Sequence, residues 1–225
     1  MENNIIKQPE EMSQFFNVRS SGYDDHMKEC IESFDEFYKK LSESIDATEE
    51  QICILDLGCG TGAEIKDILN KAPKAQIIAI DVSEKMLLEL KKKYEKYIDQ
   101  INLIIDSYLN FSFKENYYDY VMSSMTMHHL LYNKKLELYK KIRNSLKDGG
   151  KYIEGDYVVS KEKEEQFLLE YHKKMELVEK NENGSYHIDI PFSIKTQMKL
   201  FYEAGFSNAE YIYQENEAVI FVANK

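Results

Sequence analysis

The sequence has 225 residues, of which 43% are apolar, enough for one α/β domain with a buried core but little more. Its formal net charge of −11 disfavours nucleic acid and membrane surfaces as partners, because both are bound through Lys and Arg. The three cysteines form no CxxC pair, and we find neither a signal peptide nor an apolar run long enough to span a membrane. We therefore expect reduced thiols and a cytoplasmic location.

The N-terminal region predicts a helical cap. Pro9, followed by two glutamates, can begin a short helix that ends near Phe16. Apolar residues then recur at steps of three and four over residues 27–45, which predicts one longer helix with Asp24 or Asp25 as its N-cap.

From residue 51 onward, short apolar runs alternate with amphipathic helices, the pattern of βα units that build a parallel sheet. The predicted strands are 52–57, 77–81, 101–105, 118–123 and 152–155. A charged amphipathic helix after Ser160 interrupts this alternation. The two β-prone runs at 209–213 and 218–223 are joined by a short polar turn, which predicts an antiparallel hairpin.

A glycine-rich loop between the first predicted strand and helix indicates a ligand site. Gly58, Gly60 and Gly62 allow the backbone to approach a ligand without side-chain obstruction. Asp56, two positions before the first glycine, would repel a pyrophosphate but attract a cation. S-adenosylmethionine carries both an ammonium and a sulfonium. The GxGxG spacing also differs from the GxGxxG of dinucleotide enzymes.

Two further acids end successive predicted strands. Asp81 ends the second strand, where a carboxylate can accept both hydroxyl hydrogen bonds of a ribose. Asp106 ends the third strand and can accept a hydrogen bond from an adenine amino group, with Ser107 beside it. Acids in series at strand ends are a stronger signal than either residue alone.

With these motifs the chain resembles the class I S-adenosylmethionine-dependent methyltransferase family. The resemblance rests on LDLGCGTG at 55–62, IDVSEKML at 80–87, Asp106, YDYVMSSMTMHHL at 118–130 and LKDGGKYIEGD at 146–156. It implies an α/β fold with a doubly wound, seven-stranded, mostly parallel sheet and an antiparallel last strand. It also implies S-adenosylmethionine as methyl donor and S-adenosylhomocysteine as product.

The resemblance assigns parts of the cofactor to individual residues. It implies that Asp56, Gly58 and Gly60 hold the methionine end, that Asp81 holds the ribose and that Asp106 holds the adenine.

It also places the end of the fourth strand, with Ser123, along the methionine portion, and implies that Arg19 contacts the cofactor carboxylate while Tyr23 borders the transfer channel. Cys59 is expected to be a small loop residue without thiol chemistry. The expected cofactor-binding residues are Arg19, Tyr23, Asp56, Gly58, Cys59, Gly60, Asp81, Val82, Met86, Asp106, Ser107 and Ser123.

Methyl transfer from a sulfonium is an in-line displacement, so a protein mainly positions donor and acceptor and excludes water. An acceptor that must lose a proton needs a base, and His129, Asp156 and His187 are the candidates, each with a structural role as the alternative. We expect no metal site, because the adjacent His128 and His129 would not project together from an ordinary strand or helix.

We therefore expect one methyltransferase domain over residues 1–225, with 1–45 as a helical cap and 157–195 as an insertion that covers the acceptor. The predicted reaction is methylation of an O or N atom of a small molecule by a monomer or homodimer. The alternatives are a cofactor-binding regulatory protein without transferase activity and a methyltransferase acting on RNA or protein. Formation of a methylated product from labelled donor would exclude the regulatory protein. Salt-sensitive binding to a polyanion would indicate that RNA is the acceptor.

Overall fold

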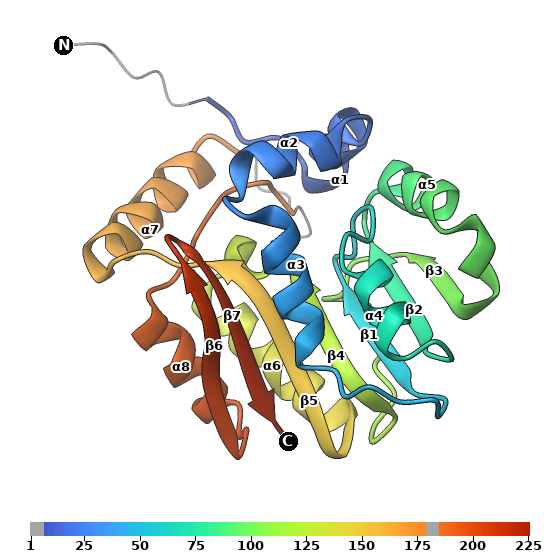
Figure 1. Cartoon of the computed structure of the whole chain (residues 1–225). Coiled ribbons are helices and arrows are strands. Elements are labelled where there is room, and N and C mark those ends of the chain that lie inside the picture. The colour runs from blue at the N-terminus through green and yellow to red at the C-terminus, as the bar shows by residue number, and fades with distance from the viewer. Residues whose placement is uncertain (1–6, 179–184) are drawn as a thin grey trace.

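A computed structural model of the chain describes residues 7–178 and 185–225. Seven strands form one sheet in the order β3-β2-β1-β4-β5-β7-β6 (Figure 1). β1 to β5 pair in parallel, whereas β7 is antiparallel to both of its neighbours, which confirms the predicted fold class. The strands are β1 (Cys53–Leu57), β2 (Gln76–Asp81), β3 (Ile101–Ile105), β4 (Tyr118–Ser124), β5 (Leu146–Tyr157), β6 (Asn208–Glu215) and β7 (Ala218–Asn224).

Helices cover both faces of the sheet, which is why its central strands are almost continuously apolar. One core contains residues of α3, α4 and α5, and the other contains residues of α6 and α8. Both cores pack against side chains from the same strands, so the sheet is the middle of three layers (Figure 1). The helices are α1 (Met12–Arg19), α2 (Tyr23–Cys30), α3 (Phe34–Glu43), α4 (Ile65–Lys71), α5 (Glu84–Lys93), α6 (Tyr132–Ser145), α7 (Lys161–Met175) and α8 (Ile194–Glu203).

The strand order creates a switch point between β1 and β4. The chain moves outward from β1 through β2 to β3, and then returns to place β4 on the other side of β1. The loops after β1 and β4 therefore diverge, and in open α/β sheets ligands bind in the crevice at such a point. Helices α1 and α2 lie above this edge of the sheet (Figure 1).

The N-terminal region differs from the prediction in two respects: two helices, α2 and α3, replace the single helix expected over residues 27–45, and the N-cap of α2 is Gly22, with Asp24 and Asp25 inside its first turn. The break contains Ile31 in an extended conformation and Ser33 at φ 54°, in the left-handed region. Helix α3 can then bury Phe37 and Leu41 against the sheet, whereas α2 buries no residue fully.

Residues 1–6 of the predicted cap and residues 179–184 of the predicted insertion lie outside the described part of the chain. Within the described ranges, no helix has both the length and the apolar character needed to cross a membrane.

Candidate active site

A cavity lies at the carboxyl ends of β1, β2 and β4. The residues of the predicted cofactor set that line it are Tyr23, Gly58, Cys59, Gly60, Asp81, Val82, Met86 and Ser107. The structure thus brings together side chains from the cap, the glycine loop and the ends of three strands.

The glycine loop forms the floor of this cavity. Gly58 has φ +70°, and a Cβ atom there would lie 2.7 Å from the hydroxyl oxygen of Thr126. Gly60 has φ +51°, which also favours glycine. The N–H groups of Gly58 and Cys59 donate to the carbonyl of Ile80, so the loop is fastened to β2. Only glycine at position 58 therefore combines this turn with the close approach of the segment after β4.

Asp81 joins the loop to the start of α5. One carboxylate oxygen accepts from the N–H of Gly60 at 2.9 Å, and the other accepts from the N–H of Ser83 at 2.8 Å. Burial raises the pKa of Asp81 to about 6, although these two hydrogen bonds oppose the shift. Each carboxylate oxygen retains acceptor capacity, which fits the predicted ribose contact.

Beneath the floor lies a second acidic group, formed by Asp56 and Glu64. Both side chains are almost completely buried, and within the described residues neither oxygen of Asp56 nor Oε1 of Glu64 has a hydrogen-bond donor. Burial raises the pKa of both carboxyls, and for Asp56 the nearby charge of Glu64 raises it further. Unpaired buried carboxylates are costly, so a cation with N–H donors would compensate both groups.

Glu64 lines the cavity but was absent from the predicted set. The available signal was its place two residues after Gly62, in the first turn that follows the glycine loop. Asp56 lies at its predicted position at the end of β1, yet it does not line the cavity. Of these two acids, Glu64 is therefore the one that a ligand in the cavity would contact.

The structure corrects one predicted wall residue from Ser123 to Ser124. The Ser123 hydroxyl lies in the core, 2.8 Å from the hydroxyl of Tyr152, and does not line the cavity. Ser124 does line it and donates to the hydroxyl of Tyr38. Successive side chains of a strand point to opposite faces, so a shift of one residue changes the side.

Two other predicted residues also lie outside this cavity. Arg19 forms an ion pair of 2.9 Å with Glu10, and its guanidinium lies over the ring of Phe15. It lines the neighbouring cavity instead. Asp106 follows β3 and accepts a hydrogen bond from the N–H of Ser107, the residue that lines the wall at this point. Burial raises the pKa of the Cys59 thiol, which leaves it protonated and unreactive.

Two hydrogen-bonded contacts hold the cap over the glycine loop and α5. Asp24 accepts from the Thr61 hydroxyl and pairs with Lys93. Asn17 accepts from the hydroxyl of Ser83 at 2.8 Å. Residues of α1 and α2 are therefore bonded directly to the elements that form the cavity.

A second, larger cavity lies beside the first and shares part of its wall. The residues common to both are Phe16, Tyr23, Met27, Met125 and His129. The second cavity is lined further by His128, Tyr157, His187 and Asp189. These five shared residues form a partition between the two cavities, and two ligands bound in the cavities would meet there.

The predicted base candidates gather at this partition, but Asp156 is enclosed. Its carboxylate accepts from the backbone N–H of His128 at 2.9 Å and lies 2.6 Å from Nδ1 of the same residue. The neighbouring imidazole of His128 and these hydrogen bonds hold the pKa of Asp156 below its usual value despite burial. Asp156 thus orients His128 rather than facing a substrate.

His129 and His187 lie closer to the open space. Burial lowers the pKa of both, to about 4 for His187, so both imidazoles are neutral at pH 7. His187 stacks on Phe15 at a centroid distance of 3.5 Å. Nδ1 of His129 lies 3.2 Å from the carbonyl oxygen of Ile188 and 3.3 Å from Asp189.

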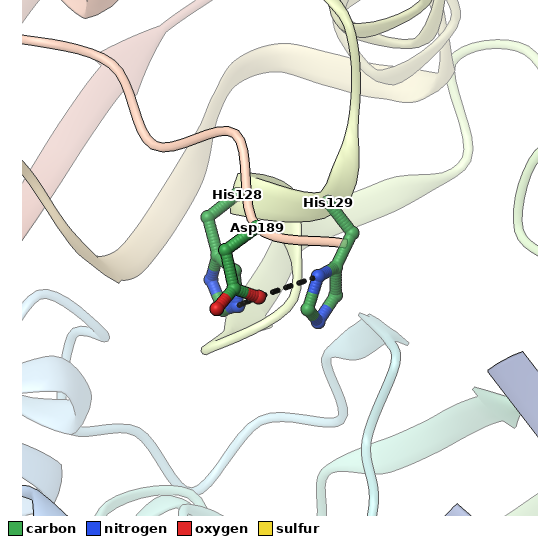
Figure 2. Close-up of side chains that lie close together, drawn as sticks. All are labelled: His128, His129 and Asp189. Carbon is green, nitrogen blue, oxygen red and sulfur yellow. Dashed lines mark ion pairs between the residues drawn. The ribbon is translucent and has the colours of Figure 1, made fainter. Parts of the chain in front are cut away.

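The reason given for expecting no metal site does not hold in this structure. His128 and His129 lie in a short 3-10 turn, and their ring centroids are 4.0 Å apart. Both face the carboxylate of Asp189 (Figure 2). Adjacent residues diverge in a strand, but this tighter turn brings the two rings to one carboxylate.

Comparison with known proteins identifies the family. A sequence profile described as a methyltransferase domain matches residues 54–150, which contain the glycine loop and β2 to β4. This match, together with the relatives described below, supports the predicted assignment to the class I S-adenosylmethionine-dependent methyltransferase family. S-adenosylmethionine is therefore its cofactor, as predicted.

Several relatives extend this methyltransferase match beyond the profile. Carboxy-S-adenosyl-L-methionine synthase from Nautilia profundicola is 24% identical over 241 aligned positions and covers 100% of both chains. The synthase from Sulfurimonas denitrificans is 29% identical and covers 90% of both. Malonyl-[acyl-carrier protein] O-methyltransferase 2 from Ilyobacter polytropus is 33% identical over 49% of this chain and 41% of its own.

Solved structures support the methyltransferase fold. The DhpI-SAM-HEP complex has a TM-score of 0.68 at 14% identity and covers 93% of this chain and 94% of its own. Human N-acetylserotonin methyltransferase in complex with SAM has a TM-score of 0.60 at 17% identity, covering 84% of this chain and 51% of its own. The chain spans only 53% to 67% of three other matching structures.

Proposed function

We propose that this enzyme transfers the methyl group of S-adenosylmethionine to an O or N atom of a small acceptor. The supporting observation is the pair of adjoining cavities, one with the acidic and glycine-rich floor and the other lined by histidines. When bound, the cofactor supplies an electrophilic methyl group on a sulfonium. The residues around it bind, orient and exclude water, as in-line displacement requires.

The first cavity is the proposed cofactor site. The carboxylates of Asp56 and Glu64 favour the ammonium of the cofactor, since both lack donors within the described residues. Asp81 accepts from the ribose hydroxyls, and Ser107 with Asp106 borders the adenine. These assignments follow the chemistry of each wall of the cavity.

The second cavity is the proposed acceptor site. Cap residues Phe16 and Tyr23 form the partition, while His187 and Asp189 come from the segment that precedes α8. In this proposal the described residues of the cap (7–45) and of the insertion (157–178 and 185–195) enclose the acceptor, as part of a single domain. For an alcohol, the acceptor oxygen bonds to the methyl carbon, the C–S electron pair stays on sulfur and the hydroxyl proton leaves. His129 and His187 are the candidate proton acceptors, and Asp156 orients His128.

A second candidate reaction is suggested by relatives that match over 90% or more of the chain. Those from Nautilia profundicola and Sulfurimonas denitrificans are named as carboxy-S-adenosyl-L-methionine synthases. Such a product carries an added carboxylate, which an arginine would bind well. Arg19 is the one arginine that lines either of the two cavities within the described residues, and it is already paired with Glu10. The ion pair is exposed and therefore weak, so the choice between methyl transfer and carboxylation depends on the reaction products.

Mass spectrometry of the reaction products tests the choice. Purified enzyme is incubated with S-adenosylmethionine and a panel of small alcohols, carboxylic acids and amines. The expected product is S-adenosylhomocysteine, in an amount equal to methylated acceptor. Accumulation of a carboxylated S-adenosylmethionine with an oxoacid donor would instead support the second reaction. Tight cofactor binding without turnover across all panels would indicate the regulatory alternative.

A further inference from the structure

Three side chains at the edge of the acceptor cavity converge on one point. His128 Nε2 lies 3.8 Å from Oδ1 of Asp189, and His129 Nδ1 lies 3.3 Å from the same oxygen. One ligand atom from each residue lies within 4.8 Å of the others. Figure 2 shows the carboxylate between the two imidazoles. We propose that these residues bind a divalent transition-metal ion such as Zn²⁺.

The spacing of the three groups fits the coordination sphere of such an ion. Zinc binds imidazole nitrogen and carboxylate oxygen at about 2.0–2.2 Å, so neighbouring ligands of a tetrahedral site are about 3.3–3.6 Å apart. The two distances to Asp189, 3.3 Å and 3.8 Å, are within a few tenths of an ångström of this value, and the ligand atoms of the two histidines lie within 4.8 Å of each other. Side-chain rotations that bring the two imidazole nitrogens closer together would complete the site.

The surroundings of His128 are those of a metal-binding histidine. Its Nδ1 lies 2.6 Å from Oδ1 of Asp156, and its backbone N–H donates to the other oxygen of that carboxylate. A proton on Nδ1 leaves the lone pair of Nε2 directed toward Asp189. Carboxylate–histidine–metal arrangements of this kind fix the tautomer and raise the basicity of the ligand.

The backbone holds the two ligand-bearing segments together. The N–H of Ile190 donates to the carbonyl of His128 at 2.6 Å. An ion bound at Nδ1 of His129 would replace the 3.2 Å contact of this atom with the carbonyl oxygen of Ile188. The loop carrying Asp189 is therefore anchored by the bond from Ile190. A site built this way requires little rearrangement when an ion binds.

The ligand set indicates the kind of ion and its place in the reaction. Two imidazoles with one carboxylate suit Zn²⁺, Co²⁺, Ni²⁺ or Fe²⁺, whereas Mg²⁺ and Ca²⁺ prefer oxygen ligands. Three protein ligands leave a coordination position open, and all three residues line the acceptor cavity. This role rests on the proposed function: an acceptor that presents a hydroxyl oxygen to the ion would be oriented at the partition. With His129 bound to the ion, His187 is the remaining candidate for proton acceptor.

Direct metal binding tests the site without relying on turnover. The full chain, without a histidine tag, is stripped with EDTA and titrated with Zn²⁺ and Co²⁺ by calorimetry and visible absorption. We expect one ion per chain and Co²⁺ absorption bands typical of a low-coordinate site. His128→Gln, His129→Gln and Asp189→Asn should each weaken binding at least tenfold. His172→Gln, an exposed histidine on α7, is the matched control and should bind as the wild type does.

Thermal melting verifies the fold of each variant independently of the cofactor. Asp189 is 40% exposed, so Asp189→Asn tests the site with the least disturbance of the core. The proposal is overturned if the stripped wild type binds no ion in the titration, or if the three variants bind Zn²⁺ as tightly as the control does. Failure of the methyl-transfer proposal would appear separately, as absence of product from a protein that binds one ion.

Discussion

Acidification should weaken cofactor binding through Asp81. The ribose hydroxyls need an ionised acceptor, but burial raises the pKa of this carboxyl to about 6 in the free protein. At pH 5 only about one-tenth of the molecules would carry the ionised form. The apparent Kd for S-adenosylhomocysteine should therefore rise about tenfold between pH 7.5 and pH 5, equivalent to about 1.4 kcal/mol.

The sign of this effect differs between binding and folding. Affinity is complete above the raised pKa and is lost as pH falls through about 6. For the free protein, protonated Asp81 contributes stability that is fully present below the unfolded value of 3.8 and is lost as pH rises through about 6. Asp56 and Glu64 also have raised pKa values, so their protonation weakens cation binding in the same direction.

Calorimetry with S-adenosylhomocysteine at several pH values measures the slope. Asp81→Asn should bind more than tenfold more weakly at pH 7.5 and should lose the part of the slope that Asp81 contributes. Glu137→Gln, an exposed acid on α6, should keep both the affinity and the slope. Equal affinities at pH 5 and pH 7.5, or an identical fall in Asp81→Asn, would refute the reasoning.

Three further predictions concern the same cavity. Gly58→Ala places a Cβ atom 2.7 Å from the Thr126 hydroxyl at a residue with positive φ, so the free energy of unfolding should fall by at least about 1 kcal/mol and cofactor binding should weaken. An unchanged thermal melting curve would contradict this. Glu64→Gln removes a buried carboxylate whose Oε1 accepts no hydrogen bond, so the melting temperature of the free protein should not fall. The affinity for S-adenosylmethionine should fall about tenfold or more. Unchanged affinity would exclude Glu64 from the ammonium site. Ser123→Ala should lower the free energy of unfolding by about 1 kcal/mol and leave cofactor affinity unchanged, whereas Ser124→Ala should weaken cofactor binding. The reverse pattern would show that Ser123, rather than Ser124, lines the cavity.

The fold and most of the cofactor site could be predicted because their signals are local. An apolar strand followed by glycines and a helix specifies a βα turn, and Gly58 to Gly60 lie where that turn was expected. Asp81 ends β2 as predicted, since the carboxyl ends of parallel strands meet at one edge. Adjacent strands then bring these residues together without further information.

The errors arose where one residue changes the outcome. Ser123 and Ser124 have identical side chains at the end of β4, so only the register of the strand decides which of them lines the cavity. The apolar period over residues 27–45 continues through the break between α2 and α3. Periodicity did not reveal the left-handed Ser33, because burial of the next helix determines where the chain bends.

The cluster of histidines depends on contacts that no local pattern contains. His129 and Ile188 are 59 residues apart, yet a contact of 3.2 Å between them helps to place Asp189 beside both imidazoles. From the sequence, the motif His128-His129-Leu130 after a strand fits both a structural role and a ligand site. The two imidazole rings point in the same direction only when the turn that carries them is tight. The packing of the segment before α8 onto that turn supplies the carboxylate. Asp156, from a third segment, then orients His128, so the chemistry of this edge follows from tertiary structure rather than from any motif.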